Sequence, residues 1–148
     1  MVDFKRILDR NSREAKIHPC EIYETLDRES GKGPLRDIQK TILDNWFDNF
    51  KEKRDVILKL HTGQGKTLIG LLLLQSRLNQ NKGPSLYLCP TKHLVEQTAQ
   101  QADSFGIKYV LAENDLPDAF IEGKSILITT TSKLFNGLTA QSNFLVME

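Results

Sequence analysis

The sequence predicts an α/β fold, a mostly parallel β-sheet flanked by helices. Short apolar runs of strand length alternate with longer stretches of helical periodicity, and turns rich in glycine, proline and asparagine separate them. This alternation is typical of βαβ units, in which a helix joins two parallel strands. The chain has 148 residues, 39% of them hydrophobic, which is enough for a domain with its own core.

Composition excludes several classes of protein. The 20 Lys and Arg nearly balance the 19 Asp and Glu, so nucleic-acid binding would require individually placed residues and not a polybasic surface. Two cysteines cannot form a disulfide framework, which favours a cytoplasmic location. The longest apolar block, residues 68–74, is far shorter than the roughly 20 residues of a membrane span.

Residues 1–33 are predicted to form a helical arm that packs on the rest of the chain and carries no chemistry. Apolar residues recur there at helical spacing: Phe4, Ile7 and Leu8, then Ile22, Tyr23 and Leu26. The run Ser30-Gly31-Lys32-Gly33-Pro34 ends the arm, and a domain covering residues 34–148 follows.

The first half of this domain reads as helix, strand, helix. One apolar helical face is formed by Leu35, Ile38, Ile42, Leu43, Trp46, Phe47 and Phe50. The partly β-branched run 56–60 predicts a buried strand. Residues 67–78 are apolar on almost every side, as expected of a helix buried against a sheet.

The second half repeats the alternation. A strand is expected at 85–89, ended by Pro90, and a helix at about 91–105. Further strands are expected at 107–111 and 125–129. Residues 144–147 begin another apolar strand.

A phosphate-binding loop is predicted between the strand at 56–60 and the helix at 67–78. The run Gly63-Gln64-Gly65-Lys66-Thr67, preceded by Thr62, offers backbone N–H groups that can approach phosphate oxygens at a helix N-terminus. Lys66 can reach the β- and γ-phosphates, and the Thr67 hydroxyl can ligate Mg²⁺. The full pattern has a glycine five residues before Gly65, where this chain has Leu60.

With three further motifs, the chain resembles superfamily 2 helicases and translocases of the DEAD/DEAH-box type. Upstream, Arg36 and Gln39 in Leu35-Arg36-Asp37-Ile38-Gln39 look like that group's Q motif. The resemblance implies that Gln39 selects ATP, because an amide can pair with the N6/N7 edge of adenine. Taken alone, Gln39 is more readily explained as a polar helix residue.

Two downstream motifs imply contacts with a nucleic-acid backbone. Residues 90–97 resemble motif Ia, in which Pro90, Thr91 and Lys92 would face phosphates. Residues 128–134 resemble motif Ib more loosely, with Thr130, Ser132 and Lys133 as the contacts. The alternative for the second segment is a plain helix start capped by Ser132.

The resemblance implies a partial RecA-like P-loop NTPase domain that binds ATP and Mg²⁺. The family places an acidic pair after the strand that follows motif Ib, and Glu148 could occupy its first position as a catalytic residue alongside Lys66. The companion acid and a second RecA-like domain would lie in a longer chain, and residues 1–148 alone are expected to be inactive or very slow.

Two function classes follow. The first is the ATP-binding lobe of a helicase or translocase whose partner is nucleic acid, DNA being favoured over RNA. The second is a non-catalytic module that binds nucleotide or nucleic acid, or acts as a decoy. An unrelated P-loop kinase is a weaker third option, because residues 90–97 argue against it.

Overall fold

The computed structural model describes residues 15–135 and 143–146. The following elements occur in chain order: α2 (Pro19–Thr25), α3 (Asp37–Asn45), the π-helical turn η1 (Trp46–Phe50), α4 (Lys66–Asn79), β1 (Ser85–Cys89), α5 (Lys92–Phe105), β2 (Tyr109–Leu111), α6 (Asp118–Ile121), β3 (Ile126–Thr130), α7 (Thr131–Phe135) and β4 (Asn143–Val146). The α/β class predicted from the alternation of elements is confirmed.

The sheet has the strand order β2-β3-β1-β4, and every neighbouring pair is parallel. Consecutive strands are joined by helical crossovers, as parallel pairing requires. Strand β1 is paired on both edges, with Cys89 in register with Thr130 at the carboxyl ends of β1 and β3. The segments that follow these two strands therefore leave the sheet side by side.

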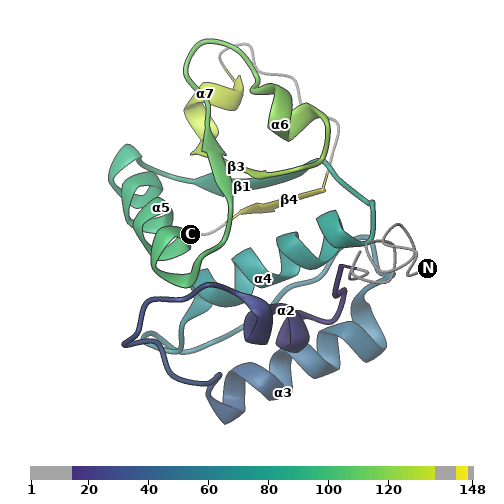
Figure 1. Ribbon diagram of the computed structural model, residues 1–148. Helices are drawn as coiled ribbons and strands as arrows, with labels where there is room; N and C mark the ends of the chain where they lie inside the picture. The colour runs from purple at the N-terminus through teal and green to yellow at the C-terminus, as the bar shows by residue number, and fades with distance from the viewer. Residues whose placement is uncertain (1–14, 136–142, 147–148) are drawn as a thin grey trace, which may run out of the picture.

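The two faces of the sheet belong to different apolar clusters. Leu86, Leu88 and Leu127 pack with Phe120 of α6. Their neighbours along the same strands point to the opposite face and join the leucines of α4: Tyr87, Cys89, Ile126 and Ile128. This alternation follows from the two-residue period of a strand, and it places α6 and α7 on one side of the sheet and α4 on the other (Figure 1).

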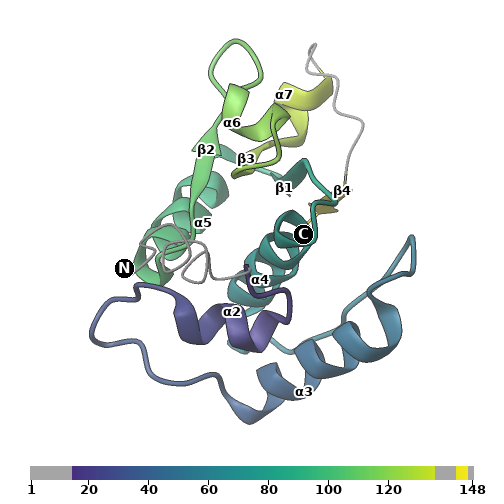
Figure 2. The same cartoon turned by 45° about the vertical axis from the view of Figure 1, so that its right-hand side comes forward.

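Helix α4 is enclosed between layers. It lies between the sheet on one side and α2 and α3 on the other in both views (Figures 1 and 2). Every residue from Leu68 to Leu74 is buried, including Gly70. A helix that is apolar all round is stable only when it is covered all round, which confirms the prediction for 67–78. Within the described residues, no helix is long and apolar enough to cross a membrane.

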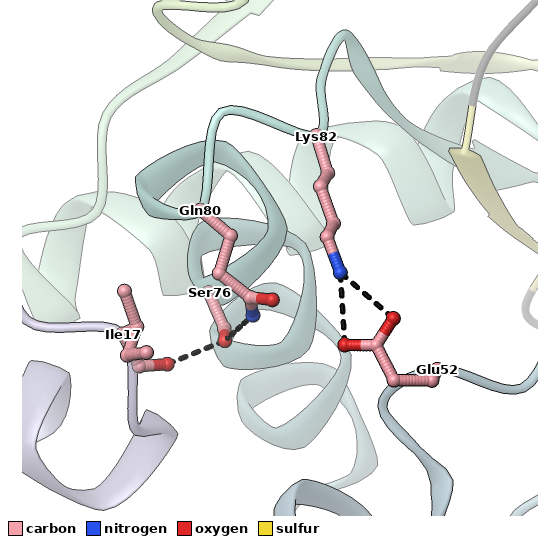
Figure 3. Close-up of polar contacts among 5 residues, drawn as sticks. All are labelled: Ile17, Glu52, Ser76, Gln80 and Lys82. Atoms are coloured by element: carbon pink, nitrogen blue, oxygen red, sulfur yellow. Dashed lines mark hydrogen bonds and ion pairs between the residues drawn. The ribbon is translucent and has the colours of Figure 1, made fainter.

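The segment before α2 is fastened to the C-terminal half of α4 (Figure 3). The buried hydroxyl of Ser76 donates to the carbonyl of Ile17 at 2.5 Å and accepts a bond from the Gln80 amide at 2.9 Å. The described part of the N-terminal arm is therefore packed on the core.

An ion pair fixes the turn that follows α4. Lys82 bonds both carboxylate oxygens of Glu52, at 2.9 and 3.0 Å, and holds the pKa of Glu52 below its ordinary value.

The prediction of a strand at 56–60 is wrong. No strand is assigned there, although Val56, Leu58 and Leu60 are half-buried and pack on the core while Ile57 is 95% exposed. The alternation of burial suits an extended segment, but no backbone ladder pairs with it in the described chain. Hydrophobic periodicity reports which side of a segment is buried and does not report whether a neighbour pairs with its backbone.

Other differences are smaller. The helical face predicted from Leu35 to Phe50 is buried at Leu35, Leu43 and Trp46, but Ile38 and Phe50 are exposed. The strand expected at 107–111 is shortened to β2, and the one at 125–129 is shifted by one residue to β3. The short helix α6 is unpredicted. The apolar residues Phe4, Ile7 and Leu8 lie outside the described residues, and the domain boundary at residue 33 stays a prediction.

Replacing Ser76 with alanine should lower the free energy of unfolding by about 1–2 kcal/mol, because the Ile17 carbonyl and the Gln80 amide both lose a hydrogen bond to its hydroxyl. Urea unfolding followed by Trp46 fluorescence would measure the loss. The matched control is Ser30→Ala at an exposed position, which should change stability by less than about 0.5 kcal/mol. Equal stability of the two variants would contradict the role assigned to the Ser76 hydroxyl.

Candidate nucleotide and nucleic-acid site

The loop that precedes α4 has the backbone of an anion-binding turn. Gly63 and Gly65 have φ angles of 83° and 72°, and Gly65 is the N-cap of α4. Glycine adopts this left-handed region without the steric cost that other residues bear. The first N–H groups of α4 have no helical acceptors and lie at the positive end of the helix dipole. The loop can therefore receive a phosphate.

The loop lies at the carboxyl edge of the sheet. Leu74, halfway along α4, accepts a bond from the Ser85 hydroxyl at the start of β1, and the short connection from α4 into β1 makes the two elements antiparallel. The N-terminus of α4 is therefore near the end of β1 where the chain leaves the sheet. Open parallel sheets bind ligands at this edge.

The predicted phosphate and metal ligands are accessible at this edge. Thr62 and Gly63 are exposed, and Gln64, Gly65, Lys66 and Thr67 are half-buried. The ammonium group of Lys66 has no hydrogen-bond or ion-pair partner among the described residues. A cation beside the N–H groups of a helix N-terminus fits the β- and γ-phosphates of ATP. A half-buried threonine hydroxyl fits Mg²⁺, which prefers oxygen ligands.

Helix α3 holds the loop from outside. The Arg36 guanidinium donates to the carbonyl of Gly63 at 2.7 Å, and Gln39 Nε2 donates to the carbonyl of Gln64 at 3.2 Å. A trans peptide points its C=O and N–H in opposite directions. Both bonds therefore turn the N–H groups of Gln64 and Gly65 away from α3, toward the side where a phosphate would bind.

Gln39 has a second, local role that the sequence analysis missed. Its Oε1 accepts the backbone N–H of Arg36 at 3.0 Å, and its side chain is only 5% exposed. This is the reach-back half of a capping box, and the three-residue spacing of Arg36 and Gln39 was the signal that could have revealed it. Both polar atoms of the amide are thus engaged by protein groups, and the adenine contact of Gln39 stays a prediction.

The motif after β1 is exposed where nucleic acid could reach it. Pro90, Thr91 and Lys92 are all exposed. Thr91 caps α5, its hydroxyl oxygen accepting the N–H of Leu94 at 3.3 Å, and its proton remains available to a phosphate. Lys92 is the first residue of α5, so its charge adds to that of the helix N-terminus.

The motif after β3 is less accessible to nucleic-acid phosphates than the sequence analysis predicted. Thr130 is buried and caps α7, accepting the N–H of Lys133 at 3.2 Å. The cap is therefore Thr130, and the alternative that gave this role to Ser132 is wrong. The Lys133 ammonium donates to the carbonyl of Ala112 at 2.5 Å, while Ser132 is exposed. Glu148, the candidate acid, lies outside the described residues.

A side-chain cluster that the sequence analysis missed joins α2 to α3. The Asp44 carboxylate lies 3.4 Å from His18 Nε2 and accepts a bond from the Cys20 thiol at 3.4 Å. His18 Nδ1 accepts the N–H of Cys20 and so caps α2. Burial and the neighbouring Asp44 raise the pKa of Cys20 to about 12, so the thiol stays protonated. We interpret the cluster as a hydrogen-bonded contact between helices.

Two comparisons identify what the chain is similar to. The family model described as DEAD/DEAH box helicase matches residues 36–148. The chain is also 30% identical over 84 residues to the ATP-dependent DNA helicase Hel308 of Pyrococcus horikoshii. That match covers 53% of the chain and 12% of the Hel308 sequence, so the chain spans a small part of this relative.

Gly65→Ala should destabilise the loop for two separable reasons. A side chain at φ 72° is strained by about 1–2 kcal/mol, and its Cβ would also collide with Nε2 of Gln39. At Gly63 (φ 83°) nothing lies within 4 Å of the added carbon, so Gly63→Ala is the control for strain alone. Urea unfolding should show a larger loss for Gly65→Ala than for Gly63→Ala.

A double variant isolates the collision. In a Gln39→Ala background the Gly65→Ala substitution should cost less stability than in the wild type, because the blocking amide is gone. An equal loss of stability in both backgrounds would show that the Gln39 amide does not obstruct a side chain at position 65.

Proposed function

The chain belongs to the DEAD/DEAH box helicase family, and we propose that it forms the ATP-binding lobe of an ATP-dependent nucleic-acid helicase or translocase. The observation that carries the proposal is the Lys66 ammonium at the N-terminus of α4, which has no partner among residues 15–135 and 143–146, beside a glycine loop whose N–H groups are turned away from α3. The partial RecA-like domain that the family implies agrees with the parallel sheet and its covering helices.

In this proposal the loop binds ATP with Mg²⁺. The N–H groups of residues 63–67 surround the phosphates, Lys66 pairs with the β- and γ-phosphates, and the Thr67 hydroxyl is a metal ligand. Mg²⁺, when bound, shields the phosphate charge. Glu148 is the one acid in the chain that we assign to the family's acidic pair, so we expect the 148 residues alone to bind ATP and to hydrolyse it very slowly.

We propose that nucleic acid binds along the carboxyl edge through Thr91, Lys92 and Ser132. Their side chains are exposed, and the segments after β1 and β3 leave the sheet as neighbours. Such contacts reach the sugar–phosphate backbone and do not read bases. The relative is named a DNA helicase, which supports DNA over RNA. Strand separation and translocation by a longer protein with a second RecA-like domain remain part of the proposal.

Lys66→Ala should weaken binding of a fluorescent ATP analogue with Mg²⁺ by roughly tenfold to a hundredfold, the value of a hydrogen bond to a charged group. The matched control is Lys53→Ala, an exposed lysine in the turn after η1, which should bind as the wild type does. Equal binding by the two variants would refute the assignment of the phosphate site. Competition with GTP tests the Gln39 prediction, because Gln39→Ala should abolish any preference for ATP.

Lys92→Ala should weaken binding of single-stranded DNA and reduce its salt dependence. Loss of one phosphate contact lowers the slope of log K against log salt by about 0.7. Fluorescence anisotropy with DNA and RNA oligonucleotides of one sequence would measure both effects. Lys108→Ala is the control, because Lys108 precedes β2 at the amino edge of the sheet. If Lys108→Ala changed the slope and Lys92→Ala did not, the proposed surface would be wrong.

A further inference from the structure

Three side chains that can bind a metal ion meet where the N-terminal arm contacts α3. His18 and Cys20 flank Pro19 at the start of α2, and Asp44 is one residue before the end of α3. Asp44 Oδ1 lies 3.4 Å from His18 Nε2 and 3.4 Å from Cys20 Sγ. One donor atom from each of the three side chains lies within 4.8 Å of the other two. Cys20 and Asp44 are 24 residues apart in the sequence, so the packing of α2 beside α3 brings them together (Figures 1 and 2).

The separations of these donor atoms match those around a tetrahedral zinc ion. With bonds of about 2.0–2.3 Å from zinc to nitrogen, oxygen and sulfur, tetrahedral angles place neighbouring donors about 3.4–3.6 Å apart. The nitrogen–oxygen and sulfur–oxygen distances of 3.4 Å are already of this size. Small rotations of the side chains therefore suffice to direct all three donors at one ion.

The chemistry of the donors selects the class of ion. A thiolate, an imidazole and a carboxylate are ligands that Zn²⁺ takes in proteins. Mg²⁺ and Ca²⁺ bind oxygen donors, and this cluster supplies only one oxygen ligand beside a nitrogen and a sulfur. The thiolate and the carboxylate together carry two negative charges, which balance the charge of one Zn²⁺.

The cluster is partly covered but open to solvent on one side. The His18 side chain is 24% exposed and packs on the ring of Phe47, with the ring centroids 4.5 Å apart. This contact limits the orientations of the imidazole before a metal ion binds. The Asp44 side chain is 56% exposed, which provides an entry path for the ion and room for water as a fourth ligand.

We propose that His18, Cys20 and Asp44 bind one Zn²⁺, which fastens the N-terminal arm to α3. In the metal-free chain the same three side chains form the hydrogen-bonded contact described above. The site is at the opposite end of α3 from Arg36 and Gln39, which hold the phosphate loop. The inference therefore goes beyond the proposed function and does not depend on nucleotide binding.

Binding of the ion rearranges two protons. The Cys20 thiol releases its proton to solvent and binds as the thiolate. His18 Nδ1 accepts the backbone N–H of Cys20, so the proton of the neutral ring is on Nε2. When Nε2 binds the ion, this proton moves to Nδ1, and the bond to the ion replaces the cap bond. One proton is thus released for each Zn²⁺ bound.

The test titrates the whole chain with Co²⁺, a spectroscopic substitute for Zn²⁺, in the absence of nucleotide. A cobalt ion bound by a thiolate gives a charge-transfer band in the near ultraviolet, whereas cobalt held by oxygen and nitrogen alone does not. One equivalent of Co²⁺ should produce this band. Zn²⁺ should abolish the band by displacing cobalt, and the titration gives its affinity. An excess of Mg²⁺ should leave the band unchanged.

Three substitutions keep the hydrogen-bonding character of the cluster and remove its ligands. Cys20→Ser still has a hydroxyl donor for Asp44, Asp44→Asn still has an accepting oxygen, and His18→Asn is still a good N-cap. Each should lower the affinity for Zn²⁺ by at least about tenfold, since even the indirect partners of metal ligands contribute that much. Cys20→Ser should also lose the charge-transfer band. The matched control is His93→Asn, at an exposed histidine of α5, which should change neither.

A stability measurement tests whether the ion fastens the two helices. Zn²⁺ should raise the urea midpoint of unfolding of the wild type and of His93→Asn, and it should not raise that of Cys20→Ser. A charge-transfer band without a rise in the midpoint would overturn the fastening role. The absence of the band in the wild type would overturn the site itself. So would an affinity for Zn²⁺ that His18→Asn and Asp44→Asn leave unchanged. None of these results would alter the case for ATP binding at the phosphate loop.

Discussion

The complete burial of α4 is the constraint on which the rest of the structure depends. Seven consecutive residues, 68–74, are covered on every side, and each buried leucine contributes about 1.5–3 kcal/mol. One surface of the helix is covered by the sheet, and the other requires α2 and α3, which is why segments before residue 50 belong to the same core as β1 and β3. Because α4 cannot shift without exposing apolar surface, its N-terminus is a fixed point at the carboxyl edge of the sheet. A phosphate site built on that point is held in place by the core.

Two sets of contacts hold the glycine loop at the N-terminus of α4. From outside, Arg36 and Gln39 hold the carbonyl groups of Gly63 and Gln64, and the planarity of the peptide transmits that hold to the N–H groups on the other side. From beneath, the buried leucines of α4 fix the helix that carries Lys66 and Thr67. Backbone donors and the proposed metal ligand are thus arranged before a ligand binds, which lowers the ordering cost of binding.

The sequence predicted the parts of this arrangement that depend on local pattern. The apolar stretch 67–78, the strand 85–89 and the helix at about 91–105 could be read directly, because hydrophobic periodicity acts within a few residues. Contacts between residues far apart in the sequence could not be predicted in this way. The run 56–60 looks like a strand, yet strand formation depends on a neighbour that the local sequence does not specify. In the run Thr129-Thr130-Thr131-Ser132 several residues are good caps, and only the end of β3 selects Thr130. Lys133 reads as a phosphate contact, but it meets the carbonyl of Ala112, 21 residues earlier.

Gln39 is the clearest case of a contact that the sequence conceals, since in Leu35-Arg36-Asp37-Ile38-Gln39 it looks like a residue that reads a base, whereas its amide bonds the backbone of Arg36 and of Gln64. With a net charge of only +1, the chain cannot attract nucleic acid by its overall field. Binding of nucleic acid therefore depends on a few individually placed groups. Strand β1 ends in the exposed segment Pro90-Thr91-Lys92, at the same edge of the sheet as the N-terminus of α4. The proposed phosphate site and the proposed nucleic-acid contacts thus share the carboxyl edge, where the core fixes the backbone that carries both.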